Sequence, residues 1–244
     1  MQASVEVSAP NCSTCAILPS RGQRALTATI LPANEKVVRL AAKKLADGAL
    51  IVLPTDTVYG LAADALLPAA VEAVFRIKER PVDKPLPLLL ADPEDVHRVA
   101  ERVPSIGWLL AERFWPGGLT IVCEKSRALP DLLTAGRPGI GLRVPDHPTA
   151  RAIIRALGAP VTGTSANLSG RPSARTAGEA HAQLGNLVDL VVDGGICPGG
   201  IESTVIDVTL DPPLVLREGA VSIQRLRQVC PKVASSFDNT GPGC

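Results

Sequence analysis

The sequence predicts an α/β protein built on a mixed β-sheet. Three observations support this: short apolar runs of strand length, amphipathic segments of helical period between them, and a spacing that tightens toward the C-terminal end. Strands that alternate with helices favour parallel pairs, whereas the last expected strands follow one another with little helix between them. Of the 244 residues, 46% are hydrophobic and 20% are charged, as expected for a chain with a real core. The pattern shows no internal repeat and no second globular domain, and it does not fix the strand order.

Helices are predicted where apolar residues recur at a spacing of three and four residues. The first is expected to begin at Asn34, which is suited to cap a helix, and to stop before Gly48. Another start stands at Asp92, where the cap is followed by a proline and two acids near the positive end of the helix dipole. In full, helices are expected over residues 34–45, 69–78, 148–158, 176–184 and 222–229, with two more between residues 92 and 114.

Strands are predicted from short apolar runs, which are typical of strands buried on both faces. Such runs span residues 49–54, 86–91, 119–124, 139–144, 160–167, 187–195, 203–208 and 213–219. The folded domain is therefore assigned to residues 34–230. Residues 1–33 are expected to form a flexible N-terminal extension, and residues 231–244 a flexible C-terminal tail.

The charge and hydropathy of the chain argue against two classes of protein. The net charge is +1, so composition gives no argument for nonspecific binding to nucleic acid, although a local basic patch stays open. No apolar run approaches the ~20 residues that span a bilayer, and the N-terminal stretch lacks the apolar region of a signal peptide. That stretch is poor in acids and carries Arg21 and Arg24, so it is either a plain extension or an organellar transit peptide. We expect a cytoplasmic protein that has no contact with the membrane.

The cysteines and histidines predict no metal held by the protein alone. Cys12 and Cys15 form a single C-x-x-C pair, whereas a structural zinc site usually takes four ligands from two such pairs. The three histidines do not show the spacing of metal ligands. In a cytosolic chain we expect the cysteine pair to be reduced.

Two segments point to a binding site. LPTDTVYGL, from Leu53 to Leu61, carries a buried strand into a turn rich in threonine and aspartate. Its short polar side chains either hold a small polar ligand or hydrogen-bond their own backbone. Further along, KERPVDKP sets Lys78, Arg80 and Lys84 close together in a loop that two prolines stiffen. Three cations beside a strand end predict a site for a polyanion such as a nucleoside triphosphate, although a solvated charged loop is the alternative.

Other polar residues stand at the ends of later strands. Ser165 and Asn167 lie in the glycine-flanked turn GTSANLSG, which either aims backbone N–H groups at an anion or simply caps a helix. Arg143 and Arg217 each lie near the end of a predicted strand, and Ser203 follows the glycine-rich loop GGICPGG. That loop either closes over a ligand or is only a long connection.

Familiar signatures of phosphate binding and covalent catalysis are missing. The chain has no G-x-x-x-x-G-K-S/T, no G-x-G-x-x-G at a turn from strand to helix, and no G-x-S-x-G. If the protein uses ATP, it binds the nucleotide by another route.

Taken in order, the motifs resemble those of one family. PTDTVYGL, K-x-R-P with K-P, W-P-G-G-L-T, G-L-R-V-P-D-H-P, T-S-A-N-L-S-G, S-T-V-I-D and L-R-E-G follow one another between Val37 and about Leu226. In this order and spacing they closely resemble the YrdC-like threonylcarbamoyl-adenylate synthase family, in its short, single-domain type. The resemblance implies a twisted mixed sheet with flanking helices around a large, positively lined cavity.

The resemblance also implies a reaction and its partners. L-Threonine, bicarbonate and ATP, with Mg²⁺, would give threonylcarbamoyl-AMP and pyrophosphate, which is a nucleotidyl transfer. The threonine amine would attack bicarbonate, and the carbamate would then attack the α-phosphate while cations stabilise the developing charge. A downstream threonylcarbamoyl transferase complex would carry the threonylcarbamoyl group to adenosine in tRNA.

The family's site residues carry over onto matching positions of this sequence. By resemblance, Thr55, Arg143 and Ser203 would hold the threonine, and the planar fork of Arg143 suits its carboxylate. Lys78 and Arg80 are the expected catalytic residues. The expected ATP contacts are Lys78, Arg80, Lys84, Gly139, Gly163, Ser165, Asn167, Ser173 and Arg217.

Two departures from the family pattern and two alternative functions stay open. Some relatives carry a histidine in the strand after the Lys-Pro element, and residues 86–91 contain none. Two-domain relatives have a C-terminal regulatory domain, for which this chain is expected to be too short.

One alternative function is a module of the same fold that binds tRNA or double-stranded RNA. The near-neutral charge and the lack of an aromatic platform argue against it. The other is an enzyme that forms a related carbamoyl-adenylate, against which the absence of zinc-finger and acylphosphatase modules argues.

Overall fold

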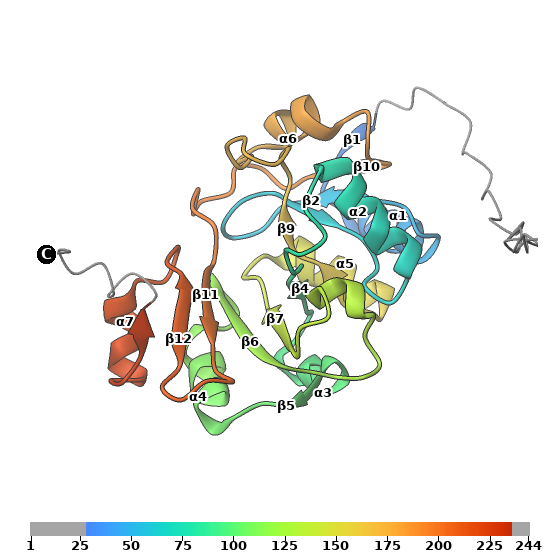
Figure 1. Cartoon of the computed structure of the whole chain (residues 1–244). Helices are drawn as coiled ribbons and strands as arrows, with labels where there is room; N and C mark the ends of the chain where they lie inside the picture. The colour runs from blue at the N-terminus through green and yellow to red at the C-terminus, as the bar shows by residue number, and fades with distance from the viewer. Residues whose placement is uncertain (1–27, 236–244) are drawn as a thin grey trace, which may run out of the picture.

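The computed structural model describes residues 28–235 and shows an α/β fold with two twisted mixed sheets (Figure 1). The predicted mixed pairing of strands is confirmed, but within the described residues the strands are divided between two sheets. Residues 1–27 and 236–244 lie outside the described part. The predictions for Cys12 and Cys15, and for most of the two flexible ends, fall on those residues.

The smaller sheet has five strands among the described residues. Their order is β1 (Thr29–Pro32), β10 (Leu190–Asp193), β2 (Ile51–Leu53), β3 (Gly60–Ala62) and β9 (Thr164–Ser165). The first three are parallel, whereas β3 is antiparallel to both of its neighbours. The sequence does not predict β1, because its short TILP segment is mostly exposed and ends in proline. Strand β1 therefore lies ahead of Asn34, where the sequence places the start of the domain.

The larger sheet has eight strands in the same part of the chain. Their order is β13 (Ala234–Ser235), β12 (Leu214–Arg217), β11 (Thr204–Asp207), β6 (Leu119–Lys125), β7 (Gly139–Arg143), β4 (Leu88–Leu89) and β8 (Val161–Thr162), and β5 (Ala100–Arg102) pairs with β6. Strand β7 is antiparallel to β6 and parallel to β4. Strand β5 is largely exposed and is not predicted, and β13 extends the sheet beyond residue 230.

The helices follow the predicted order. They are α1 (Glu35–Ala46), α2 (Pro68–Lys78), α3 (Val96–Val99), α4 (Ser105–Phe114), α5 (Pro148–Leu157), α6 (Ala177–Leu184) and α7 (Ile223–Val229). The predicted cap of α1 is confirmed, because Oδ1 of Asn34 accepts a hydrogen bond from the N–H of Val37 at 3.0 Å. Among the helices of residues 28–235, none is long and apolar enough to cross a membrane.

Two apolar clusters hold these elements together. One joins α1 and α5 to the smaller sheet through residues such as Leu45 and Ile153. The larger cluster extends from α2 through β4, β6 and β7 to α7 and includes the fully buried Tyr59. The adjacent residues Leu88 and Leu89 of β4 belong to different clusters, so this strand joins the two packed regions.

The segment 160–167, predicted as one strand, forms two strands in two different sheets. Strand β8 pairs with β4 in the larger sheet, and β9 pairs with β3 in the smaller one. Gly163 lies between them, and a Cβ on it would come within 2.8 Å of the Cγ of Leu89. A side chain would therefore obstruct the crossing from one sheet to the other. The crossing places the turn after β9 where the sheets meet, and Figure 1 draws β9 between β2 and β4.

Candidate functional site

Two adjoining cavities lie near the crossing from β8 to β9. The inner cavity has a volume of about 110 Å³ and is lined in part by Arg143. The outer cavity has a volume of about 280 Å³ and is lined in part by Lys78. Arg80, Ser165 and Glu202 line both cavities. The shared lining makes them one candidate site with two compartments.

The guanidinium of Arg143, at the end of β7, is fixed at the inner cavity by three acceptors. Its Nε donates to the Gly117 carbonyl at 2.8 Å, and its terminal nitrogens donate to Thr57 Oγ1 at 2.9 Å and to Asp56 Oδ1 at 2.5 Å. The carboxylate of Asp56 also accepts from the N–H of Asp146 at 3.0 Å. Burial lowers the pKa of Arg143, and the Asp56 carboxylate opposes that shift. These contacts use three of the five N–H donors of the guanidinium, and Arg143 lines the inner cavity.

Thr55, an expected threonine contact, organises the turn that presents Thr57. Its hydroxyl donates to the carbonyl of Val58 at 2.6 Å and accepts from the N–H groups of Thr57 at 3.1 Å and Val58 at 3.2 Å. In this structure the hydroxyl therefore serves the turn, which is the alternative that the sequence left open for this segment. Thr57, which the sequence analysis did not select, lines the inner cavity and accepts from Arg143.

Ser203, an expected threonine contact, and Arg217, an expected ATP contact, both line the inner cavity. The hydroxyl of Ser203 lies 2.8 Å from that of Thr120. Arg217 donates to the Ser203 carbonyl through Nε at 3.2 Å and through a terminal nitrogen at 2.8 Å, and it forms an ion pair with Glu202. The antiparallel pairing of β11 with β12 brings these residues together.

The glycine-rich loop 194–200 is packed onto the turn that carries Asp56. The N–H of Gly199 donates to the Asp56 carbonyl at 3.1 Å, and a Cβ on Gly199 would lie 2.7 Å from that oxygen. At the other end of the loop, the hydroxyl of Tyr59 donates to the carbonyl of Gly195 at 2.7 Å. Both ends of the loop are therefore held by hydrogen bonds in this structure. Glu202 and Ser203, which line the inner cavity, follow the loop after one intervening residue.

Lys78, the last residue of α2, supports the turn that follows β9. Its ammonium group donates to the carbonyl of Ser165, to the carbonyl of Asn167 at 2.9 Å and to Asn167 Oδ1 at 3.1 Å. These acceptors take all three of its protons. Burial is the main cause that lowers the pKa of Lys78 to about 8; the charge of Arg80 adds to it, and that of Glu202 opposes it. Lys78 thus holds the turn and adds positive charge beside the outer cavity.

Arg80 and Lys84 lie in the loop after α2 and both line the outer cavity. The guanidinium of Arg80 folds back onto this loop, donating through Nε to the Lys84 carbonyl at 3.2 Å and through a terminal nitrogen to the Pro85 carbonyl at 2.9 Å. Because Arg80 lines both cavities, its other donors can reach a ligand in either compartment. The structure therefore brings the predicted cations together at a cavity.

The predicted polar ATP contacts also line the outer cavity. The hydroxyl of Ser165 donates to Asn167 Oδ1 at 2.6 Å, and the Asn167 amide donates to the carbonyl of Arg171. The hydroxyl of Ser173 donates to Glu202 Oε1 at 3.0 Å. These hydrogen bonds link the turn after β9 into a defined wall of the cavity.

The two glycines expected at the ATP site lie in different places. Gly163 lines the inner cavity. Gly139 begins β7, at the opposite end of that strand from Arg143, and does not belong to the lining of either cavity. A Cβ on Gly139 would lie 2.8 Å from Val122 Cγ1 of the neighbouring strand. Close packing between β6 and β7 explains this glycine, and the structure does not bring it to the site.

Glu202 is the main site residue that the sequence analysis misses. Its carboxylate accepts from Ser173 and pairs with Arg217. Burial raises the pKa of Glu202, but Arg217, the nearby hydroxyls and Lys78 together outweigh burial and hold it below its usual value. A lone glutamate after a glycine-rich loop shows no recognisable pattern. The one feature of the sequence that could have pointed to Glu202 is its position directly before Ser203, which is a predicted threonine contact.

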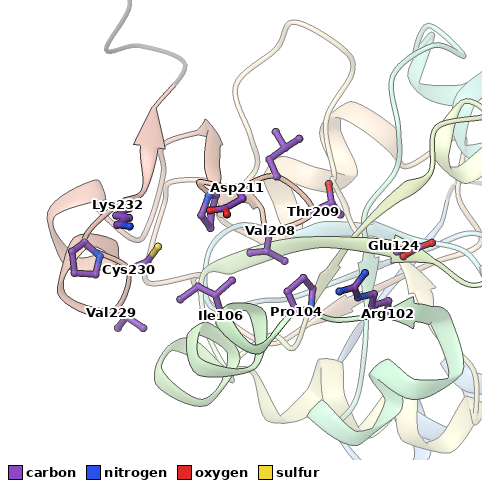
Figure 2. Close-up of a pocket in the computed structure, with 13 residues that line it drawn as sticks. Arg102, Pro104, Ile106, Glu124, Val208, Thr209, Asp211, Val229, Cys230 and Lys232 are labelled. Carbon is purple, nitrogen blue, oxygen red and sulfur yellow. The ribbon is translucent and has the colours of Figure 1, made fainter.

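A larger cavity, of about 610 Å³, lies apart from these residues and is shown in Figure 2. Its walls come from the connection into α4, from the hairpin between β11 and β12 and from the end of α7. Its charged groups are of both signs, with Arg102 beside Glu124 and Asp211 on the side of Lys232 in Figure 2. None of the predicted site residues lines it, so its size alone does not make it the functional site.

Comparison with known proteins gives a family that spans the whole candidate site. Residues 43–219 match the Sua5/YciO/YrdC family model, which is described as Telomere recombination. The threonylcarbamoyl-AMP synthase of Pyrococcus abyssi is 38% identical over 80% of this chain and 58% of that protein, and the one of Bacillus subtilis is 38% identical over 82% and 58%. The chain therefore spans 58% of the length of each of these two relatives.

Solved structures show the same fold. The structure of P. abyssi Sua5 complexed with L-threonine superposes with a TM-score of 0.83 and 36% identity, covering 85% of this chain and 62% of that chain. The structure of E. coli YciO gives a TM-score of 0.75 and 29% identity, with 82% and 99% covered. All the residues that line the two cavities fall within the part of the chain that matches the family model. The chain belongs to the Sua5/YciO/YrdC family.

Proposed function

We propose that this chain makes threonylcarbamoyl-AMP and pyrophosphate from L-threonine, bicarbonate and ATP, and so acts as a nucleotidyltransferase. The observation that carries the proposal is the pair of adjoining cavities. One is lined in part by the buried Arg143, and the other is lined by Lys78, Arg80 and Lys84. A carboxylate suits the first compartment and a triphosphate suits the second, because both ligands are anions with several acceptor oxygens. The names of the two curated relatives support the same reaction.

In the proposed arrangement the threonine lies in the inner cavity. Its carboxylate accepts from the guanidinium of Arg143, and the hydroxyls of Thr57 and Ser203 are within the same lining. Thr55 contributes by holding the turn that presents Thr57. A family member that has been crystallised with L-threonine supports a threonine site in this fold.

The triphosphate of ATP lies in the outer cavity. Arg80 and Lys84 are placed to contact phosphate oxygens, and Arg217 reaches the same region from the inner cavity. Ser165, Asn167 and Ser173 supply the polar contacts. The amine end of the threonine and the triphosphate then meet where the two cavities adjoin.

The proposed chemistry needs no nucleophile from the chain. The threonine nitrogen bonds to the carbon of bicarbonate, and loss of water leaves a carbamate. A carbamate oxygen then bonds to the α-phosphorus while the bond between that phosphorus and the pyrophosphate oxygen breaks. The residues of the chain orient the reactants and stabilise charge on the phosphate oxygens. Arg80 is the catalytic cation in this proposal, whereas Lys78 acts chiefly by positioning the turn that uses its three protons.

Mg²⁺ is expected to accompany ATP, and the residues of the outer cavity fit such an ion. Mg²⁺ takes oxygen ligands and is usually held by one or two carboxylates together with substrate phosphates. The outer cavity offers the carboxylate of Glu202 and the hydroxyls of Ser165 and Ser173. Residues 28–235 contain no group of three or more His, Cys, Asp and Glu that could hold a metal ion, which favours an ion that enters with the nucleotide. When bound, Mg²⁺ would neutralise negative charge on the phosphate oxygens.

The test is release of pyrophosphate by the purified chain. We expect release only when L-threonine, bicarbonate and ATP are all present, and reactions without threonine or without bicarbonate are the controls. Release no greater than in the reaction without threonine would contradict the proposal. Supplying carbamoyl phosphate in place of threonine and bicarbonate tests the related carbamoyl-adenylate reaction.

We further propose that the product passes to a threonylcarbamoyl transferase that modifies tRNA in the cytoplasm. Threonylcarbamoyl-AMP is a mixed anhydride of a carbamic and a phosphoric acid, so water destroys it unless an acceptor enzyme is at hand. Adding a purified transferase and tRNA to the synthase reaction tests this step. Modified tRNA should form only when both proteins are present, and its formation by the transferase alone with ATP would contradict the proposal. Direct binding of tRNA or double-stranded RNA by this chain stays an expectation that a gel-shift measurement would check.

A further inference from the structure

Glu202 places a negative charge in the middle of a site built for an anion. It lies between the glycine-rich loop and β11 and lines both cavities. Its side chain is 36% exposed, so the carboxylate borders the space that a ligand would occupy. In a polyphosphate site, a carboxylate at this position repels the phosphate oxygens unless a positive charge lies between them.

The contacts of Glu202 show that its charge belongs to the cation cluster. One oxygen accepts from Ser173 at 3.0 Å, and the other pairs with Arg217. The charges of Lys78 and Arg80 also interact with it, since its carboxylate favours the charged form of each. The cations meanwhile disfavour one another, Arg80 acting on Lys78 and Arg217 acting on Arg80. Glu202 therefore holds like charges together in the ligand-free protein.

A bound triphosphate would take over that role. Its oxygens supply negative charge to the same cations, so the Glu202 carboxylate would face like charge across the shared wall of the cavities. A divalent cation between the carboxylate and the phosphates removes this conflict, because carboxylate and phosphate oxygens are the ligands that Mg²⁺ uses together. The same carboxylate thus opposes the free nucleotide and favours the metal-bound one.

We propose that Glu202 makes nucleotide binding at this site depend on a divalent cation, by repelling free ATP and accepting MgATP. The inference rests on the proposed function, because it takes the outer cavity as the triphosphate site. The effect acts on equilibrium binding of the nucleotide and does not require turnover.

A purely structural role for Glu202 makes a different prediction. Through its ion pair it helps to hold Arg217, which in turn donates to the Ser203 carbonyl. If that were its whole contribution, loss of its charge would weaken binding of ATP and of MgATP by the same factor. The ratio of the two affinities separates the two roles.

The experiment measures binding of α,β-methylene-ATP by isothermal titration calorimetry, in EDTA and in excess Mg²⁺, without threonine or bicarbonate. This analogue keeps the charges of ATP but resists cleavage at the bond that the proposed reaction breaks. In the Glu202→Gln variant we expect the gain in affinity from Mg²⁺ to fall by about tenfold relative to wild type, with tighter binding in EDTA, which is a typical size for coupling between two sites. Glu202→Asp keeps the charge and should keep most of the gain.

Two controls define the result. Glu79→Gln removes a neighbouring exposed carboxylate that lines neither cavity, and it should leave the ratio unchanged. Thermal melting of each variant shows that it is folded, and Glu202→Ser replaces the Gln variant if that one is not. An unchanged ratio in Glu202→Gln, or equal weakening in both conditions, would overturn the proposal. Failure of the wild-type protein to bind the analogue in either condition would instead count against the proposed function.

Discussion

The polar side chains of this site form hydrogen bonds with other residues of the same site. Arg143 is fixed by Asp56, Thr57 and the Gly117 carbonyl, and Lys78 gives all three of its protons to the turn after β9. Such contacts restrict the side chains before binding, so less rotamer entropy is lost when the ligand arrives. They also mean that substitutions at these positions act on stability as well as on activity.

Lys78 and Arg80 should differ in this respect. We expect Lys78→Ala to remove most activity and also to lower the free energy of unfolding by about 1–3 kcal/mol, because carbonyl groups near it lose their donor. Arg80→Ala should lower activity by about 100-fold with little change in unfolding, because this partly exposed side chain forms its hydrogen bonds within its own loop. Pyrophosphate release and urea denaturation measure the two effects. Normal turnover in Arg80→Ala would refute its assignment to the phosphates.

Arg143 and Asp56 should act on threonine rather than on ATP. We expect Arg143→Ala to raise the KM for threonine most, by about 100-fold, and Asp56→Asn to raise it by about tenfold because Arg143 loses the partner that aims it. The KM for ATP should change much less in both variants. Arg137→Ala, an exposed arginine that lines neither cavity, is the matched control. An unchanged threonine dependence in Arg143→Ala would be evidence against its carboxylate role.

At the scale of elements, the site depends on where β8 gives way to β9. The strand from the larger sheet continues into the smaller one within a few residues, and the turn that follows carries Ser165 and Asn167 to the cavities. Lys78 reaches this turn from the end of α2. A helix end and a strand crossing thus fix the same turn from two directions.

Gly163→Ala should disturb this crossing. Its Cβ would lie 2.8 Å from Leu89 Cγ and 2.9 Å from Leu89 Cδ2, so we expect a loss of about 1–3 kcal/mol in unfolding free energy and a higher KM for ATP. Gly178→Ala is the matched control, because a Cβ there meets nothing within 4 Å in α6. That change should stabilise the protein by about 0.5–1 kcal/mol, as alanine does in a helix. Urea denaturation checks both, and equal stability in the two variants would contradict the packing argument.

At the scale of the whole molecule, the features that could be predicted are those that depend on neighbouring residues in the sequence. Features that depend on contacts between distant segments could not be predicted. The helices and the buried strands repeat apolar residues at a fixed period, so their order follows from the sequence. Strands β1 and β5 are short and exposed, and the division at Gly163 depends on which distant strand pairs with each half. The sequence also selects most cations of the site. Glu202 could not be predicted from the sequence, because its role depends on the nearby charges of Lys78, Arg80 and Arg217. These residues are distant in sequence, and only the fold brings them close to Glu202.

The buried charge of Lys78 links stability and binding across the molecule through pH. Its pKa of about 8 lies below its ordinary value of 10.5, so between these two values the unfolded chain keeps a proton that the native chain releases. Unfolding free energy should therefore rise with pH over this window in wild type relative to Lys78→Met, by up to roughly 3 kcal/mol.

Affinity for the nucleotide should follow the opposite trend. As pH rises through about 8, Lys78 loses its charge and the outer cavity becomes less positive, so binding of the ATP analogue should weaken. Because a bound triphosphate favours the charged lysine, binding near pH 8.5 should take up part of a proton, which calorimetry in buffers of different ionisation enthalpy detects. Lys78→Met should show neither the proton uptake nor this part of the pH dependence. If wild type bound the analogue at pH 8.5 without proton uptake, the buried lysine would not be coupled to the nucleotide site.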